Sequence, residues 1–142
     1  MKQLVVRTFV TCILLAVTKF SYGFNSADTA FKRLITKEWK LSSYEEKGKK
    51  FPPAPQHKED KMIFYQNNEV KSTDGGKVEY GIWKYDADKK TLTVIDNDSL
   101  EETVLKVVKL DEAGCILEYQ DPQGGILKMY MLPGKVSSLE NK

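Results

Sequence analysis

From residue 38 onward, the chain alternates apolar and polar residues in short runs, and turn-forming residues follow almost every run. A period of two is typical of a β-strand with one buried face, because successive side chains point to opposite sides of the sheet. The turn signals recur roughly every 10–12 residues, which is the spacing of an all-β domain. The runs lie at residues 38–44, 61–66, 69–72, 77–85, 91–95, 101–110, 115–120 and 126–132. The pattern predicts about eight short strands.

The connections between these runs are short, so neighbouring strands should pair as an up-and-down antiparallel meander. The segment Asp74-Gly75-Gly76 is a good hairpin turn, since glycine reaches the positive φ angles that tight turns need. An open meander would expose two edge strands, and closing the sheet on itself removes both. We therefore expect a small antiparallel β-barrel at residues 24–135, followed by a polar tail at residues 136–142.

The first 23 residues have the order of a signal peptide. Lys2 and Arg7 precede an uncharged apolar run at residues 8–18, and small residues follow at the spacing of a cleavage site. The run has about 11 residues, whereas a membrane-spanning helix needs about 20. We predict a signal peptide at residues 1–23 and an exported protein, periplasmic or secreted, with no membrane span after cleavage.

A short helix is predicted between the signal peptide and the first strand. Residues 25–28 offer side chains that can cap a helix, and apolar residues then recur at helical spacing. The predicted helix covers residues 27–36. Such a helix commonly covers or plugs one end of a barrel.

Charge and cysteine content narrow the possible functions. Removing residues 1–23 takes away three basic residues and no acidic one, which leaves 19 basic and 20 acidic side chains. A near-neutral domain has no electrostatic basis for binding nucleic acid. Cys115 is then the single cysteine, so the fold must be held by its core without an intramolecular disulfide. Its apolar neighbours indicate a buried core thiol rather than a reactive one.

Short aromatic motifs carry a resemblance to a known family. They are EWKLSSYE at residues 38–45, MIFY at 62–65, YGIWKYD at 80–86, KKTLT at 89–93 and VVKL at 107–110. In these motifs the chain resembles the lipocalin-like domain proteins that Bacteroidetes-type bacteria secrete. The resemblance implies a signal peptide, an eight-stranded barrel and no catalytic residues. One departure is that Glu38 stands where the family usually has a glycine before its tryptophan.

The residues that usually support catalysis or metal binding are scarce. His57 is the only histidine and lies beside a lysine in a proline-rich loop, so we interpret it as a loop residue rather than a metal ligand or a titrating group at a barrel mouth. Asp96, Asp98 and Glu101 could suggest a calcium loop. That loop lacks the required glycine, and Leu100 stands where a ligand is needed, so a hairpin turn is favoured. We predict no enzyme activity, no metal site and no cofactor.

The aromatic residues of the strands carry the one indication of function. A barrel of eight strands either has a solid core or encloses one small ligand, and the sequence is compatible with both alternatives. Large aromatic side chains with polar groups can line such a pocket. The candidate ligand-binding residues are Phe64, Tyr80, Trp83, Tyr85, Tyr119 and Tyr130.

The run at residues 77–85 poses a particular question about these aromatics. Its two faces carry Val78, Tyr80 and Ile82 on one side and Trp83 and Tyr85 on the other. Both faces cannot point inward, so one set must be exposed, or a bulge near Gly81 must switch the register. An exposed set would be a candidate interaction patch.

Two classes of function follow. The first is an exported lipocalin-like binding protein for a small apolar or amphipathic ligand. The second is a protein-interaction module, such as a periplasmic inhibitor or an accessory subunit of a cell-envelope complex, with a solid barrel core. The second rests on the proline-rich, basic loop at residues 47–58, which is long enough to reach a partner.

Overall fold

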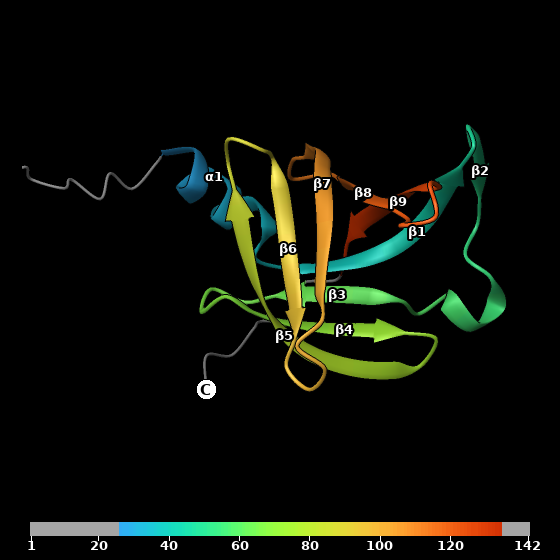
Figure 1. Cartoon of the computed structure of the whole chain (residues 1–142), viewed down its shortest axis with the longest axis horizontal. Coiled ribbons are helices and arrows are strands. Elements are labelled where there is room, and N and C mark those ends of the chain that lie inside the picture. Colours follow the sequence, from blue (N-terminus) through green and yellow to red (C-terminus); the bar gives the residue numbers. More distant parts are fainter. Residues whose placement is uncertain (1–25, 135–142) are drawn as a thin grey trace, which may run out of the picture.

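The computed structural model describes residues 26–134, and these form one sheet with one α-helix beside it (Figure 1). The helix α1 spans Ser26–Ile35, and a 3-10 helix, η1, spans Pro55–His57. The strands are β1 (Glu38–Glu46), β2 (Lys49–Phe51), β3 (Lys61–Phe64), β4 (Glu69–Asp74), β5 (Lys77–Asp86), β6 (Thr91–Asp96), β7 (Glu102–Leu110), β8 (Cys115–Gln120) and β9 (Ile126–Pro133). The predicted signal peptide at residues 1–23 and the polar tail at residues 136–142 lie outside the described residues.

Eight of the strands close into an antiparallel barrel. Strands β3 to β9 pair in chain order, and β1 pairs with β3 on one side and with β9 on the other. The closing ladder runs from Trp39 opposite Pro133 to Glu46 opposite Leu127. This confirms the predicted all-β, up-and-down barrel of lipocalin-like architecture. Strand β2 adds to the far half of β1, where the sequence predicts only a loop.

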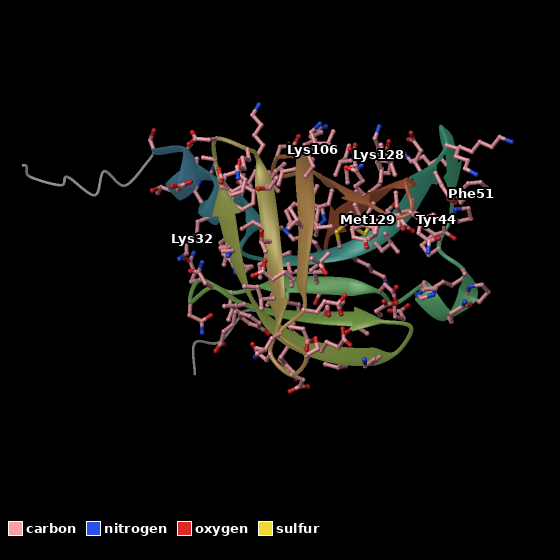
Figure 2. The ribbon with its side chains drawn as sticks, in the orientation of Figure 1. Lys32, Tyr44, Phe51, Lys106, Lys128 and Met129 are labelled. Carbon is pink, nitrogen blue, oxygen red and sulfur yellow. The ribbon has the colours of Figure 1, made fainter. Side chains whose placement is uncertain are left out.

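The register of the strands decides which side chains point into the barrel. A bulge between Leu41 and Ser43 shifts the pairing of β1 with β9, so Leu41 and Tyr44 both face the interior although they lie three residues apart. Opposite Tyr44 on β9, Met129 lies within the barrel, while Lys106 and Lys128 point away from it (Figure 2). On these strands apolar side chains therefore point inward, and the two lysines point to solvent.

Strand β5 settles the question of its two faces. Its pairings with β4 and β6 show no register shift, and Trp83 and Tyr85 point inward. The other face is exposed, with Tyr80 at 57% of its full accessibility. Gly81 is needed for a different reason from a bulge: a Cβ at this position would overlap the backbone carbonyl oxygen of Ile95 on β6. The glycine thus allows close approach of two strands.

The tightly packed core lies at the end of the barrel that α1 covers. Phe31 and Ile35 of α1 insert their side chains there, and the Phe31 ring stacks on Tyr85 with centroids 3.6 Å apart. The strand residues of this core are Trp39, Phe64, Val70, Trp83, Leu92, Leu105, Cys115, Leu117 and Met131. Trp39 is fully buried and donates from Nε1 to the carbonyl oxygen of Ile35, 2.9 Å away. The expectation of a helix at one barrel end is confirmed.

Polar contacts hold α1 on the barrel end. Lys32 Nζ donates to Asn68 Oδ1 in the β3–β4 turn at 2.8 Å. Arg33 and Lys37 both bind the carboxylate of Glu112 in the β7–β8 turn, at 2.7 and 2.8 Å. These ion pairs are solvent-exposed on at least one side, so each contributes at most about 1 kcal/mol. The apolar face of α1 is the larger source of its docking energy.

Cys115, at the start of β8, belongs to this core with 1% of its surface exposed. Burial raises the pKa of its thiol from 9.0 to about 12. The thiolate is the nucleophilic form of cysteine, and the folded protein does not expose it. The predicted buried core thiol is therefore present.

We expect Cys115 to react with a disulfide reagent such as DTNB only as fast as the protein unfolds, measured at about pH 8 in a Cys12→Ser background. Urea should restore rapid labelling. Between pH 9 and about 12 the unfolded chain loses a proton that the folded chain keeps, so the unfolding free energy should fall as pH rises through this window. Cys115→Ala should remove that component. Rapid labelling of the folded protein would contradict the expectation.

Candidate ligand-binding hollow at the barrel mouth

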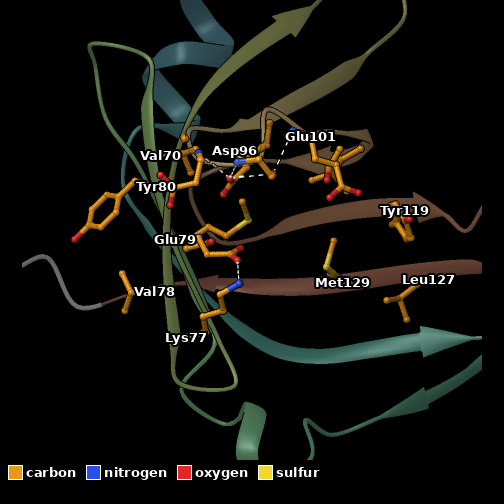
Figure 3. A pocket seen from close by; sticks show the side chains of 18 residues that line it. Val70, Lys77, Val78, Glu79, Tyr80, Asp96, Glu101, Tyr119, Leu127 and Met129 are labelled. Carbon is orange, nitrogen blue, oxygen red and sulfur yellow. Dashed lines mark hydrogen bonds and ion pairs between the residues drawn. The ribbon is translucent and has the colours of Figure 1, made fainter.

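The barrel interior is hollow at the end opposite α1. A cavity of about 620 Å³ opens between the start of β5, the β6–β7 turn and strands β8 and β9. Its apolar wall includes Leu105, Tyr119, Leu127 and Met129, and the last three lie across from β5 (Figure 3). The barrel thus combines the two predicted alternatives. Its half under α1 has a solid core, and its half at the mouth encloses a hollow.

A second arm of the hollow extends toward β1 and η1. It has a volume of about 400 Å³ and includes Leu41, Tyr44 and Met131 in its wall. The two arms share five lining residues, which are Met62, Ser72, Glu79, Leu127 and Met129. We define the two arms together as the mouth hollow. Its apolar floor rests on the packed core and its upper wall reaches solvent.

The rim of the first arm is polar. Lys77 and Glu79, both on β5, form an ion pair (Figure 3). Next to the start of β5 the rim is formed by the β6–β7 turn, whose Asp98 and Glu101 also line the cavity. Apolar side chains inside a concave site and polar groups at its rim are features that sites for small molecules commonly combine.

The β6–β7 turn is held by the carboxylate of Asp96. Its Oδ1 accepts hydrogen bonds from the backbone N–H groups of Asp98 and Ser99 at 2.9 and 2.7 Å, and from the Ser99 hydroxyl at 3.0 Å. The hydrogen bonds from Ser99 lower the pKa of the Asp96 carboxyl below its usual value. Asp96 therefore stabilises the turn, which agrees with the hairpin turn predicted for this segment.

On the other side of the mouth, His57 of η1 contacts two carboxylates. Its Nδ1 lies 2.7 Å from Asp60 Oδ2 and 3.1 Å from Asp74 Oδ1, and Asp60 also accepts from the backbone N–H of Gly75 at 2.8 Å. The three side chains could present ligand atoms to one metal ion, since these atoms lie within 4.8 Å of one another. In the structure, His57 is in direct contact with both carboxylates. These contacts tie the proline-rich segment to the β4–β5 hairpin at the barrel mouth.

The six aromatic residues that the sequence predicts to bind a ligand lie in different parts of the barrel. Tyr119 lines the first arm of the mouth hollow. Phe64, Trp83 and Tyr85 lie at the packed end, where Trp83 meets the Phe64 ring edge-on at 6.0 Å. Burial raises the pKa of Tyr85. These three residues form the base beneath the hollow, outside its lining.

Two of the six candidates lie on the outer surface. The ring of Tyr80 points away from the cavity, although its position on β5 borders the rim (Figure 3). The Tyr130 hydroxyl donates to Glu45 Oε2 at 2.6 Å, which raises the pKa of the tyrosine. Lys50 lies over the Tyr130 ring, 3.6 Å from its centroid. The structure therefore brings Tyr119 alone of the six into the wall of the hollow by its side chain.

Most of the apolar residues in the wall are aliphatic or sulfur-containing, and the prediction from aromatic content did not include them. Examples are Met62, Leu105, Leu127 and Met129. Strand alternation could have found them, because Leu127 and Met129 share a face with the buried Met131. Alternation does not show, however, which end of a strand meets the plugged end of the barrel.

No family model matches the chain, and no curated protein is significantly similar to it. Within residues 26–134, α1 is neither long nor apolar enough to cross a membrane.

Proposed function

We propose that this protein is an exported, lipocalin-like binding protein that holds one small apolar or amphipathic molecule in the mouth hollow. The observation that carries the proposal is a hollow of about 620 Å³ with an apolar wall, open to solvent through a polar rim. Ligand sites typically have volumes of about 300–1,000 Å³. The plugged end gives the hollow a closed floor, so a ligand would enter and leave through the mouth.

Export rests on the sequence of residues 1–23, with its basic start, apolar run and small residues near the end. The resemblance to secreted lipocalin-like proteins supports the same location, periplasmic or extracellular. We further propose that the protein binds without catalysing a reaction. The strongest nucleophile of the core, Cys115, is buried and its thiol pKa is raised to about 12, so it supports no covalent chemistry.

The proposal predicts that the neutral apolar dye N-phenyl-1-naphthylamine binds to the protein with enhanced fluorescence. Thr103 lines the hollow on β7, and a Thr103→Trp change would place an indole ring in it. We expect this variant to bind the dye at least about tenfold more weakly, because even a few lost ligand contacts cost that much affinity. Fluorescence titration measures the effect.

The neighbouring residue provides a matched control. Val104 follows Thr103 on the same strand but is 51% exposed on the outer face. Val104→Trp should therefore keep the affinity of the unchanged protein. A protein that binds no dye, or a pair of variants with equally weakened binding, would contradict a ligand site in the hollow.

A protein-interaction module is the second candidate, and the outer face of the barrel favours it. Val78, Tyr80 and Ile82 on β5 and Val104 on β7 are each about half exposed, and apolar side chains in such number suit a protein contact. The segment at residues 47–58 supports it less, because His57 is tied to the barrel. Failure of dye binding, together with a stable envelope partner that Tyr80→Lys abolishes, would favour this candidate.

A further inference from the structure

The charge around the mouth hollow is strongly unbalanced. Six carboxylates line its two arms, namely Asp60, Asp74, Glu79, Asp96, Asp98 and Glu101. Two lysines, Lys61 and Lys77, are the only lysines or arginines that line these two arms. The chain after residue 23 is nearly neutral as a whole. The negative charge at the mouth is therefore a local feature of the fold.

Both lysines are already paired with carboxylates. Lys77 binds Glu79, and Lys61 Nζ lies 3.1 Å from Glu38 Oε2, a carboxylate outside the hollow. The hydrogen bond and charge of Glu79 raise the pKa of Lys77, and the nearby charges of Asp96 and Asp74 act in the same direction. The charge of each lysine is therefore already offset by a neighbouring carboxylate.

The carboxylates divide into a satisfied group and an unpaired group. Asp60 and Asp74 contact His57 on one side of the mouth. On the other side, Asp96, Asp98 and Glu101 form no ion pair with any residue in the range 26–134. Asp96 accepts hydrogen bonds within its turn, but these leave its charge in place. We define Asp98 and Glu101 as the free acidic pair of the rim.

The free acidic pair stands at the edge of the same arm whose wall is formed by Leu105, Tyr119 and Met129. We propose that the mouth hollow selects cationic amphiphiles: molecules with an apolar body that enters the arm and an ammonium or similar cationic head that stays at the rim. This inference rests on the proposed function and adds the chemical class of the ligand. A carboxylate or phosphate head would instead meet uncompensated negative charge at this rim.

The test compares three ligands with the same ten-carbon chain and different heads: decylammonium, decanol and decanoate. Isothermal titration calorimetry at neutral pH gives the three affinities. We expect decylammonium to bind about tenfold more tightly than decanol, since two or three solvent-exposed ion pairs together give a preference of about that size. Decanoate should bind more weakly than decanol. Raising sodium chloride from about 20 mM to about 500 mM should reduce the differences, because salt screens exposed charges.

Substitutions locate the preference on the rim. The double variant Asp98→Asn, Glu101→Gln should lower the ratio of decylammonium to decanol affinity toward one. The matched control is Glu69→Gln, Glu102→Gln, which also removes two negative charges, from exposed residues that lie outside the lining of both arms. This control should keep the ratio. Circular dichroism checks that both double variants remain folded.

The outcomes separate this inference from the proposal on which it rests. Binding of all three ligands with equal affinity, or tightest binding of decanoate, would overturn the selection for cations while leaving a binding hollow. An equal decrease of the decylammonium-to-decanol affinity ratio in both double variants would also overturn the inference. The preference would then depend on the net charge of the protein and not on the rim. Failure of all three ligands to bind would overturn both the inference and the proposed function.

Discussion

Trp39→Ala is expected to cost about 3–5 kcal/mol of unfolding free energy, the usual range for removing a large aromatic side chain from a packed core. Trp39 is fully buried where β1 begins. Its indole ring joins α1 to the barrel through the hydrogen bond from Nε1 to the Ile35 carbonyl oxygen. Urea unfolding followed by far-ultraviolet circular dichroism measures the loss without depending on tryptophan fluorescence.

Trp39→Phe separates packing from the hydrogen bond. A phenyl ring keeps much of the buried apolar contact and removes the Nε1 donor, so the loss should be smaller, about 1–2 kcal/mol. The Ile35 carbonyl oxygen still accepts from the backbone N–H of Lys37 at 2.8 Å, which limits the cost. A loss below about 1 kcal/mol for Trp39→Ala would show that this barrel end is not the main core.

Phe31→Ala should release α1 from the barrel end and cost about 3 kcal/mol, toward the lower end for a core phenylalanine because the residue lies at the core's edge. Phe31 stacks on Tyr85 and lies 6.2 Å from the Trp83 ring centroid. A ten-residue helix is only marginally stable without tertiary contacts. Hydrogen exchange of the α1 amides should therefore accelerate more than exchange in the strands.

Ala30→Ser is the control for the helix, because Ala30 is exposed and precedes Phe31. This change should alter stability by only about 0.5 kcal/mol through helix propensity. Retained protection of the α1 amides in Phe31→Ala would mean that Ile35 and the polar contacts of Lys32, Arg33 and Lys37 suffice to dock the helix. The packed end would then depend less on Phe31 than its burial indicates.

The residues of the candidate site could be predicted from the sequence only in part. Aromatic content singles out Tyr119, which lines the hollow, but also Tyr80 and Tyr130, which lie outside the barrel. A strand buries one face, and aromatic residues on the other face are equally compatible with the same alternating pattern. The pairing of β5 with β4 and β6 within the barrel determines that the face with Trp83 and Tyr85 is the buried one.

The acidic rim and the His57 contacts are also products of tertiary structure. His57 and Asp74 are 17 positions apart in the sequence, and the pairing of β3 with β4 brings Asp74 next to η1. Asp98 and Glu101 read in sequence as ordinary turn residues. The pairing of β5 with β6 places their turn beside the start of β5, which carries Lys77 and Glu79.

Local patterns in the sequence were enough to predict the eight strands of the barrel, their meander order and the N-terminal helix, because alternation, turn residues and helical spacing each involve neighbouring residues. Tertiary structure decided which face of β5 is buried, which barrel end is packed and which charges meet at the mouth. Those outcomes depend on register and closure, which join residues far apart in the chain. A period of two defines two faces of a strand, but only pairing around the closed barrel determines what each face meets.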